Sequence, residues 1–289
     1  MVCNLCGSRN SKVLFASTRY PDGYPFDVLQ CRSCGLVFRD FSLSSHFFLK
    51  QGTNTWSRRS CPDKYTARKM LVFNFFIEFI SPFRKLNRIL DVGSGQGLFL
   101  KLCSDNYWQV WGLEVDPRLA KYSKKHYNIE VFNGSLEESQ YQENFFDAIT
   151  FINVLEHLPD PYFAIKESHR LLRPGGCLLI RFTNAAFHVQ FRRLFSFLRT
   201  KWGGIGRFNP STIHLYAFNR ASISSYLHRA GFRQEIIKNS IFTKYHEVAQ
   251  GNTVQWSMLH VAKFAMEIIG RLSNGRALVA PSLFAAGFK

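Results

Sequence analysis

The clearest pattern of apolar and polar positions lies in residues 89–100, where a short apolar run gives way to glycines at alternate positions. Residues 89–92 are typical of a buried strand. The glycines are Gly93, Gly95 and Gly97. Glycine lets the backbone turn sharply and approach a ligand, because it accepts a positive φ and has no side chain. We expect a helix to begin at Leu98 with its N-terminus facing the turn, so the pattern predicts a strand, a ligand-binding turn and a helix.

A second apolar run, residues 109–113, ends in the acidic residues Glu114 and Asp116. The order of strand, helix and strand predicts a doubly wound α/β sheet, in which Glu114 lies beside the glycine turn and can accept hydrogen bonds from both hydroxyls of a ribose. Folds that bind nicotinamide dinucleotides and folds that bind S-adenosylmethionine share this arrangement. The glycine spacing separates them, because the dinucleotide pattern G-x-G-x-x-G needs a small residue where Leu98 stands.

Residues 65–85 are apolar almost all round and predict a helix. Its narrow polar stripe consists of Asn74, Glu78, Ser81 and Lys85. We interpret it as a helix buried between two structural units, and contact with a membrane surface is the alternative. Residues 41–63 predict a polar linker that folds over a cofactor or substrate, and residues 254–272 predict another mostly apolar helix.

Residues 187–201 predict an amphipathic basic helix. Its apolar positions are Phe187, Phe191, Leu194, Phe195 and Leu198, and its other face carries His188, Arg192, Arg193, Arg199 and Lys201. Three interpretations stay open. The helix is a lid whose cations grip a phosphate or carboxylate, or it lies on an anionic membrane, or it packs on the sheet and leaves its basic side in solvent.

The chain has 289 residues and a net charge of +17, which is unevenly distributed. Residues 89–180 are net acidic, whereas the segments on both sides are net basic. This favours a cationic ligand inside and an anionic partner outside, such as a phosphorylated metabolite, an anionic membrane or RNA; charge that serves solubility alone is the alternative. We see no secretory signal and no run of 18 apolar residues, and we expect a cytoplasmic protein, at most peripheral to the inner face of the membrane.

Two C-x-x-C-G units stand near the start of the chain. Their cysteines are Cys3, Cys6, Cys31 and Cys34. Four thiolates from two tight turns are typical of a tetrahedral structural zinc site, and redox dithiols or an iron–sulfur cluster are the alternatives. We therefore expect a zinc ribbon over residues 1–45, a linker and helix over 46–88, and a ligand-binding domain over 89–289.

The order of motifs resembles a class I S-adenosylmethionine-dependent methyltransferase. Residues 91–97 (D-V-G-S-G-Q-G) resemble the first motif of that family and residues 112–117 (G-L-E-V-D-P) its second. Residues 133–138 fall at its adenine turn, residues 145–161 resemble its fourth strand and following helix, and residues 171–180 resemble the turn into its fifth strand. The resemblance implies a Rossmann-like, doubly wound seven-stranded sheet whose last strand, over residues 276–288, is antiparallel, with the sixth strand over residues 231–238.

The resemblance also implies roles for particular residues. The three glycines admit the methionine and ribose portions of the donor, Asp91 holds its amino-acid end and Glu114 binds its ribose. Ser135 and Leu136 lie near the adenine, although Ser135 stands where the family usually has an acid, so the backbone of Leu136 is the better candidate. Asn153 is assigned to the same cofactor site.

His157 follows the expected fourth strand and is the leading candidate for a general base, with a structural role as the alternative. Residues 214–218, H-L-Y-A-F, resemble the substrate side of zinc-ribbon methyltransferases from sugar and polysaccharide pathways. This makes His214 and Tyr216 further catalytic candidates and a sugar precursor the expected acceptor. An RNA methyltransferase and a non-catalytic binding protein are the competing functions, and the acceptor atom stays open.

Overall fold

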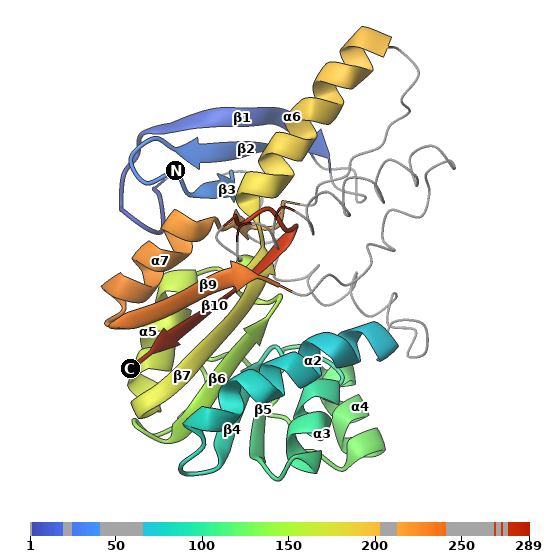
Figure 1. Cartoon of the computed structure of the whole chain (residues 1–289), viewed down its shortest axis with the longest axis vertical. Helices are drawn as coiled ribbons and strands as arrows, with labels where there is room; N and C mark the ends of the chain where they lie inside the picture. Colours follow the sequence, from blue (N-terminus) through green and yellow to red (C-terminus); the bar gives the residue numbers. More distant parts are fainter. Residues whose placement is uncertain are drawn as a thin grey trace.

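The computed structural model describes residues 2–19, 25–40, 66–202, 213–240, 269, 273 and 277–289. Its centre is a six-stranded mixed sheet with the order β5-β4-β6-β7-β10-β9 (Figure 1). The strands are β4 (Arg88–Val92), β5 (Gln109–Leu113), β6 (Phe146–Ile152), β7 (Leu172–Thr183), β9 (Gln234–Asn239) and β10 (Ser282–Phe288). Strands β5, β4, β6 and β7 run parallel, whereas β10 is antiparallel to β7 and β9. The α/β class and the antiparallel last strand are therefore confirmed.

The prediction of seven strands is corrected to six in the described residues. The segment between β5 and β6 makes only an isolated parallel bridge, Leu113 to Phe132. The backbone N–H of Phe132 donates to the carbonyl of Gly112 at 2.9 Å. The chain then enters a turn at Asn133, so this pairing ends before a strand forms. The last strand is also shorter than expected, because it begins at Ser282.

Helices cover both faces of the sheet (Figure 1). They are α2 (Thr66–Ile80) with the short η1 (Ser81–Phe83), α3 (Leu98–Asp105), α4 (Pro117–Tyr127), α5 (Pro161–Leu171), α6 (Ala185–Trp202) and α7 (Arg220–Arg229). Side chains alternate along β4, so Ile89 packs with α2 and α3 and Leu90 packs in the core that contains α5 and α7. Helices α4 and α5 begin where sequence dictates, because Asp116 and Asp160 cap them ahead of a proline.

The sequence predicted that helix α2 is buried between two structural units, but the structure places it elsewhere. Its buried residues Phe76 and Ile80 pack with α3 and the sheet in one core, whereas the buried apolar residues of the N-terminal module belong to two other clusters. Phe75, Phe76 and Phe79 all contact the ring of Phe284 on β10. The helix is apolar on most sides because it covers the face of the sheet over several strands.

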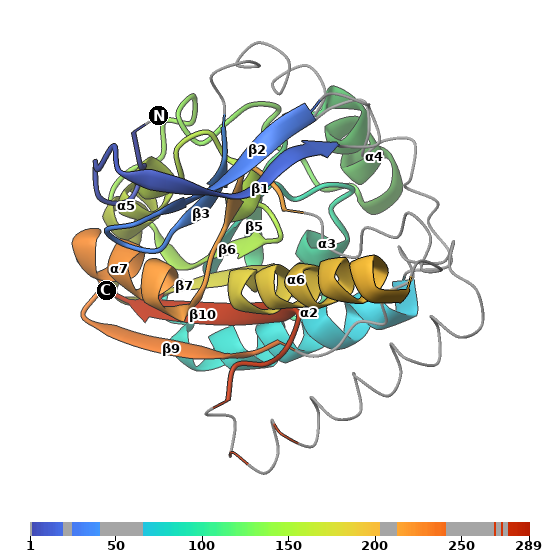
Figure 2. The same ribbon diagram turned by 90° about the horizontal axis from the view of Figure 1, so that it is seen from above.

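The N-terminal module forms a second sheet of four strands, β1-β2-β3-β8. Strands β1 (Ser11–Arg19), β2 (Pro25–Cys31) and β3 (Val37–Arg39) come from the N-terminal residues, but β8 (Tyr216–Ala217) comes from late in the chain. The module is therefore joined to the rest of the protein through its own sheet. Figures 1 and 2 show it lying above one end of the main sheet, near α7.

Helix α6 spans the residues expected for the basic helix, but its two faces are not divided as predicted. His188, which was assigned to the solvated face, is buried, and its Nε2 lies 3.2 Å from the carbonyl of Pro281. The guanidinium of Arg192 stacks on the ring of Phe15 at 4.1 Å. The sheet of the N-terminal module thus contacts the basic face of this helix, which none of the three interpretations of the sequence had included. Within the described residues, no helix is long and apolar enough to cross a membrane.

The predicted linker over residues 41–63 and the predicted helix over residues 254–272 lie outside the described residues, apart from the single residue Ile269.

Candidate functional site

In the glycine turn after β4, protein atoms leave no space for a side chain at the first and third glycines, whereas the middle glycine faces open space. All three glycines have a positive φ, 72° at Gly93, 58° at Gly95 and 81° at Gly97. A Cβ at Gly93 would stand 2.5 Å from Cγ2 of Val154, and a Cβ at Gly97 would stand 2.2 Å from Oγ of Ser123. A Cβ at Gly95 would meet nothing within 4 Å. Packing therefore requires glycine at the first and third positions, and the middle one borders open space.

Glu114 follows β5 and is fixed beside this open position. Its Oε2 accepts a hydrogen bond from the N–H of Gly95 at 2.8 Å, and its Oε1 accepts one from the N–H of Asp116 at 2.9 Å. Burial raises the pKa of the Glu114 carboxyl, and these backbone donors offset part of that rise. Each carboxylate oxygen keeps a lone pair for a further donor, so the side chain can also accept hydrogen bonds from the two hydroxyls of a ribose.

A second buried acid, Asp91, lies in β4 just before the glycines. It is 3% exposed, and Oγ1 of Thr150 donates a hydrogen bond of 2.6 Å to its Oδ1. Burial raises the pKa of Asp91 to about 7, Thr150 opposes the rise and the charge of Glu114 adds to it. Two neighbouring buried carboxyls favour a cationic ligand, which would offset their repulsion. Sequence reasoning missed Thr150, although a polar residue inside an apolar strand was a visible signal.

The turn after Phe132 is tied to the acidic end of β5. Nδ2 of Asn133 donates to the carbonyl of Glu114 at 2.8 Å. The N–H of Ser135 donates to Oε2 of Glu138 at 2.6 Å, and Leu136 is buried. The structure thus brings the residues proposed for the adenine to the side of the turn that carries Glu114, and their contacts with adenine stay a prediction.

Asn153 stands at the end of β6 with a φ of 58°. Its N–H donates to the carbonyl of Arg181 at 2.9 Å, and its Oδ1 accepts from the guanidinium of Arg181. Nε of Arg181 donates in turn to Oγ of Ser240 at 3.0 Å. These contacts hold the loop after β6 against β7, and a direct contact of Asn153 with a cofactor stays a prediction.

Three residues meet at the carboxyl end of the parallel strands, next to Val154. Glu156, His157 and His214 each offer a ligand atom, and these atoms all lie within 4.8 Å of one another. The two imidazole rings are 4.1 Å apart, centroid to centroid. Glu156 is 1% exposed and accepts a hydrogen bond from Oγ1 of Thr183 at 3.1 Å. The structure therefore brings together two histidines that are far apart in sequence.

Both histidines are held in their neutral form. Burial, and to a smaller extent the charge of Arg39, lower the pKa of His157 to about 4. Burial also lowers the pKa of His214 well below its usual value, with His157, Arg39 and His188 adding to the effect. A base with so low a pKa is a poor proton acceptor near pH 7, but a neutral imidazole is a good hydrogen-bonding group and metal ligand.

Tyr216, the remaining catalytic candidate, makes a structural contact. Its hydroxyl donates to the carbonyl of Pro159 at 3.1 Å, and its ring stacks on that of Phe218. Burial raises the pKa of its hydroxyl, so the group stays protonated. The contact fixes the segment around β8 beside the loop that follows His157, and a catalytic role for Tyr216 stays a prediction.

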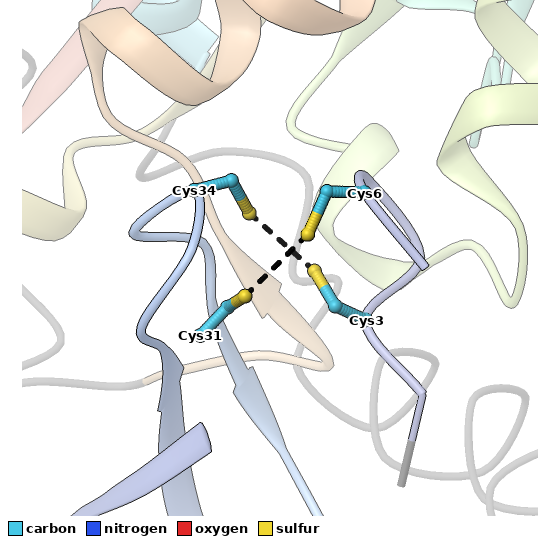
Figure 3. Close-up of side chains that lie close together, drawn as sticks. All are labelled: Cys3, Cys6, Cys31 and Cys34. Carbon is cyan, nitrogen blue, oxygen red and sulfur yellow. Dashed lines mark hydrogen bonds between the residues drawn. The ribbon is translucent and has the colours of Figure 1, made fainter. Parts of the chain in front are cut away.

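The four N-terminal cysteines converge on one point (Figure 3). Sγ of Cys3 is 3.5 Å from that of Cys34, and Sγ of Cys6 is 3.6 Å from that of Cys31. Four sulfurs around one zinc ion at about 2.3 Å would stand about 3.8 Å apart, so the spacing fits the ion without rearrangement.

The two cysteine turns have the same backbone geometry. The N–H of Gly7 donates to the carbonyl of Cys3 and that of Gly35 to the carbonyl of Cys31, with φ values of 73° and 75° at the two glycines. Burial would raise the pKa of Cys31, but N–H groups of its own turn and neighbouring thiols lower it to about 7, which favours the thiolate at this cysteine. Burial raises the pKa of Cys3 and Cys34. These residues would hold a closed four-thiolate site with no position for a substrate.

Comparison with known proteins agrees with the fold. A model of the methyltransferase domain family matches residues 67–235. A ubiquinone biosynthesis O-methyltransferase from Xanthomonas axonopodis pv. citri is 28% identical over 174 residues, which cover 56% of this chain and 70% of that protein. One from Xanthomonas oryzae pv. oryzae is 35% identical over 103 residues, 34% of this chain and 43% of that protein.

Among solved structures, the crystal structure of an S-adenosylmethionine-dependent methyltransferase from Archaeoglobus fulgidus aligns with a TM-score of 0.51 at 20% identity, covering 77% of this chain and 94% of that one. At this identity the likeness concerns the fold. The family model covers more than half of the chain and includes the glycine turn, Glu114 and the loop after β6. The chain therefore belongs to the methyltransferase domain family and is a methyltransferase.

Proposed function

We propose that the protein methylates an oxygen atom of a small molecule, and that the acceptor is a sugar or polysaccharide precursor. The observation that carries the proposal is the group of the buried Glu156 and the half-buried His157 and His214. It lies beside Val154, which itself packs on the turn at Gly93. In this proposal, these hydrogen-bonding groups face the acceptor next to the methyl group of the donor. The sugar acceptor is supported by the sequence resemblance of residues 214–218 and of the cysteine module to zinc-ribbon methyltransferases.

A second candidate acceptor is a hydroxyl of a ubiquinone precursor, because the matched Xanthomonas proteins are ubiquinone biosynthesis O-methyltransferases. Both candidates are small molecules with a hydroxyl acceptor. RNA is the less favoured acceptor, although the basic charge outside residues 89–180 is compatible with it.

The roles proposed for the donor side follow from the contacts. S-adenosylmethionine, when bound, supplies an electrophilic methyl carbon on a sulfonium. Asp91 and Glu114 offer the negative charge that the cation needs, and Glu114 accepts from the ribose while its other contacts keep it fixed. The transfer is an in-line displacement, so holding the acceptor oxygen against the methyl carbon supplies much of the rate.

In the N-terminal module we propose a structural zinc ion on Cys3, Cys6, Cys31 and Cys34. Arg39, at the end of β3, donates through Nε to the carbonyl of Ile213 at 2.7 Å, and its backbone N–H donates to the carbonyl of Leu215 at 3.0 Å. Nδ2 of Asn4 donates to Oδ1 of Asp160 at 3.0 Å. The zinc module would thus hold both segments that border the acceptor side.

The proposal is tested by incubating the protein with isotopically labelled donor and a panel of hydroxylated acceptors. The panel contains nucleotide sugars, oligosaccharides, polyhydroxybenzoates and structured RNA. Label in a sugar supports the full proposal, and label in a benzoate supports the second candidate. Label only in RNA, or in an amine alone, would overturn it.

A further inference from the structure

The group formed by Glu156, His157 and His214 is built from two segments that are each held in place. Glu156 and His157 lie in η2 (Leu155–His157), directly after β6. His214 precedes β8, in the segment whose carbonyls bind Arg39. Tyr216 links the two segments through its hydrogen bond to Pro159. The three side chains are therefore presented to one another by fixed backbone on both sides.

The donor set of this group is that of a metal site. It contains two neutral imidazoles and one carboxylate, the ligands of many catalytic zinc sites, which keep a further position open for a substrate oxygen. Oε2 of Glu156 is buried and has no hydrogen-bond partner in the described part of the chain. Burial raises the pKa of the Glu156 carboxyl, and a bound cation in place of its proton would satisfy this oxygen.

We propose that Glu156, His157 and His214 bind a divalent ion of the zinc type, separate from the four-cysteine site. Three ligand atoms about 2.1 Å from one ion stand about 3.4 Å apart, so a pair of ligand atoms now within 4.8 Å of each other has to approach by about 1.4 Å at most. Rotation of side chains is enough for a closure of this size.

Two arginines lower the affinity of this site for a cation, so the cysteine site binds its ion more tightly. Arg39 lies close enough to lower the pKa of both histidines, and the charge of Arg181 acts on Glu156. Both guanidiniums are held by other groups, Arg39 by the carbonyl of Ile213 and Arg181 by Ser240 and Asn153. Their positive charge opposes a cation, so the ion at this site leaves first when a chelator is added.

The ion would act on the acceptor, and this part of the inference rests on the proposed O-methylation. An acceptor hydroxyl that binds the open position has a lowered pKa and releases its proton to water. The resulting oxygen attacks the methyl carbon of the donor, the carbon–sulfur bond breaks, and S-adenosylhomocysteine leaves with the electron pair. This scheme provides an activated oxygen although the two histidines are poor bases.

The test measures the zinc content of the full chain after removal of any affinity tag, equilibration with zinc alone and gel filtration. The wild type should hold about two zinc ions per chain, His214→Ala about one, and the double variant Cys31→Ser/Cys34→Ser also about one. His126→Ala, a change of an exposed histidine on α4, is the matched control and should keep both ions. Glu156→Gln retains an acceptor for Thr183 but lowers zinc affinity at least about tenfold.

Cobalt substitution identifies which ion is lost. His214→Ala should keep the thiolate-to-cobalt charge-transfer band of the cysteine site, which also shows that the module is folded. A wild type that holds one zinc ion, or a His214→Ala protein that holds the same number as the wild type, would overturn the inference.

Donor binding, measured by calorimetry on the same samples, separates the inference from the proposed function. If the protein binds the donor but holds only one zinc ion, the metal inference is wrong and the proposed function stands. If the protein holds two zinc ions but methylates no hydroxyl, the proposed O-methylation is wrong and the metal inference stands.

Discussion

Replacing Gly93 and Gly95 one at a time separates two reasons for glycine in the donor turn. Both residues have a positive φ, so alanine or valine at either position adds about 1–2 kcal/mol of backbone strain. At Gly93 the new Cβ also stands 2.5 Å and 2.9 Å from the two γ carbons of Val154, and such overpacking costs about 1–3 kcal/mol more. Gly93→Ala should therefore lose about 2–5 kcal/mol of the free energy of unfolding.

Gly95→Val should affect donor binding much more than stability. Its Cβ meets no protein atom within 4 Å, so the valine enters the space next to Glu114 that we assign to the donor. We expect S-adenosylmethionine to bind at least about 100-fold more weakly, which corresponds to about 2.7 kcal/mol. The loss of unfolding free energy should stay near the strain alone, about 1–2 kcal/mol.

Urea unfolding and calorimetric titration with S-adenosylmethionine measure the two quantities. The double variant Gly93→Ala/Val154→Ala is the control, because it removes the γ carbons that the new Cβ meets. It should lose less stability than the two single variants added together. Strict additivity of those losses, or micromolar donor affinity retained in Gly95→Val, would refute this account of the turn.

Three further outcomes are expected. Glu114→Gln should weaken S-adenosylmethionine binding by about 1–3 kcal/mol in calorimetry, because the charged acceptor is lost; unchanged affinity would remove Glu114 from the ribose site. Donor affinity should rise with pH up to about 7 and then level off, because the cation prefers ionised Asp91 and binding below that pH releases its proton; Asp91→Asn should flatten the profile, and a wild-type profile that is already flat would contradict this role. Cys31→Ser/Cys34→Ser should lose zinc from the N-terminal module and lower the midpoint of thermal unfolding by at least about 5 °C, and unchanged metal content would exclude the site.

Some features of the structure could be predicted because a few neighbouring residues determine them. The turn at Gly93, Gly95 and Gly97 follows from positive φ values that glycine adopts without strain. The caps at Asp116 and Asp160 place the starts of α4 and α5. Other expectations failed where packing against distant residues decided the outcome. His188 looked like part of a solvated basic face, but α6 packs against the segment before β10 and buries it.

The sequence by itself determined the local geometry of the side that we assign to the donor. The glycine spacing and Glu114 lie within one strand-turn-helix-strand unit, so local backbone geometry specifies them, and each C-x-x-C-G unit likewise specifies its own turn. Only the tertiary structure decided the acceptor side. His157 and His214 meet because β8 pairs with β3 of the N-terminal module and Arg39 holds the segment at Ile213. Contacts between segments so far apart depend on how whole layers pack, which no local pattern encodes.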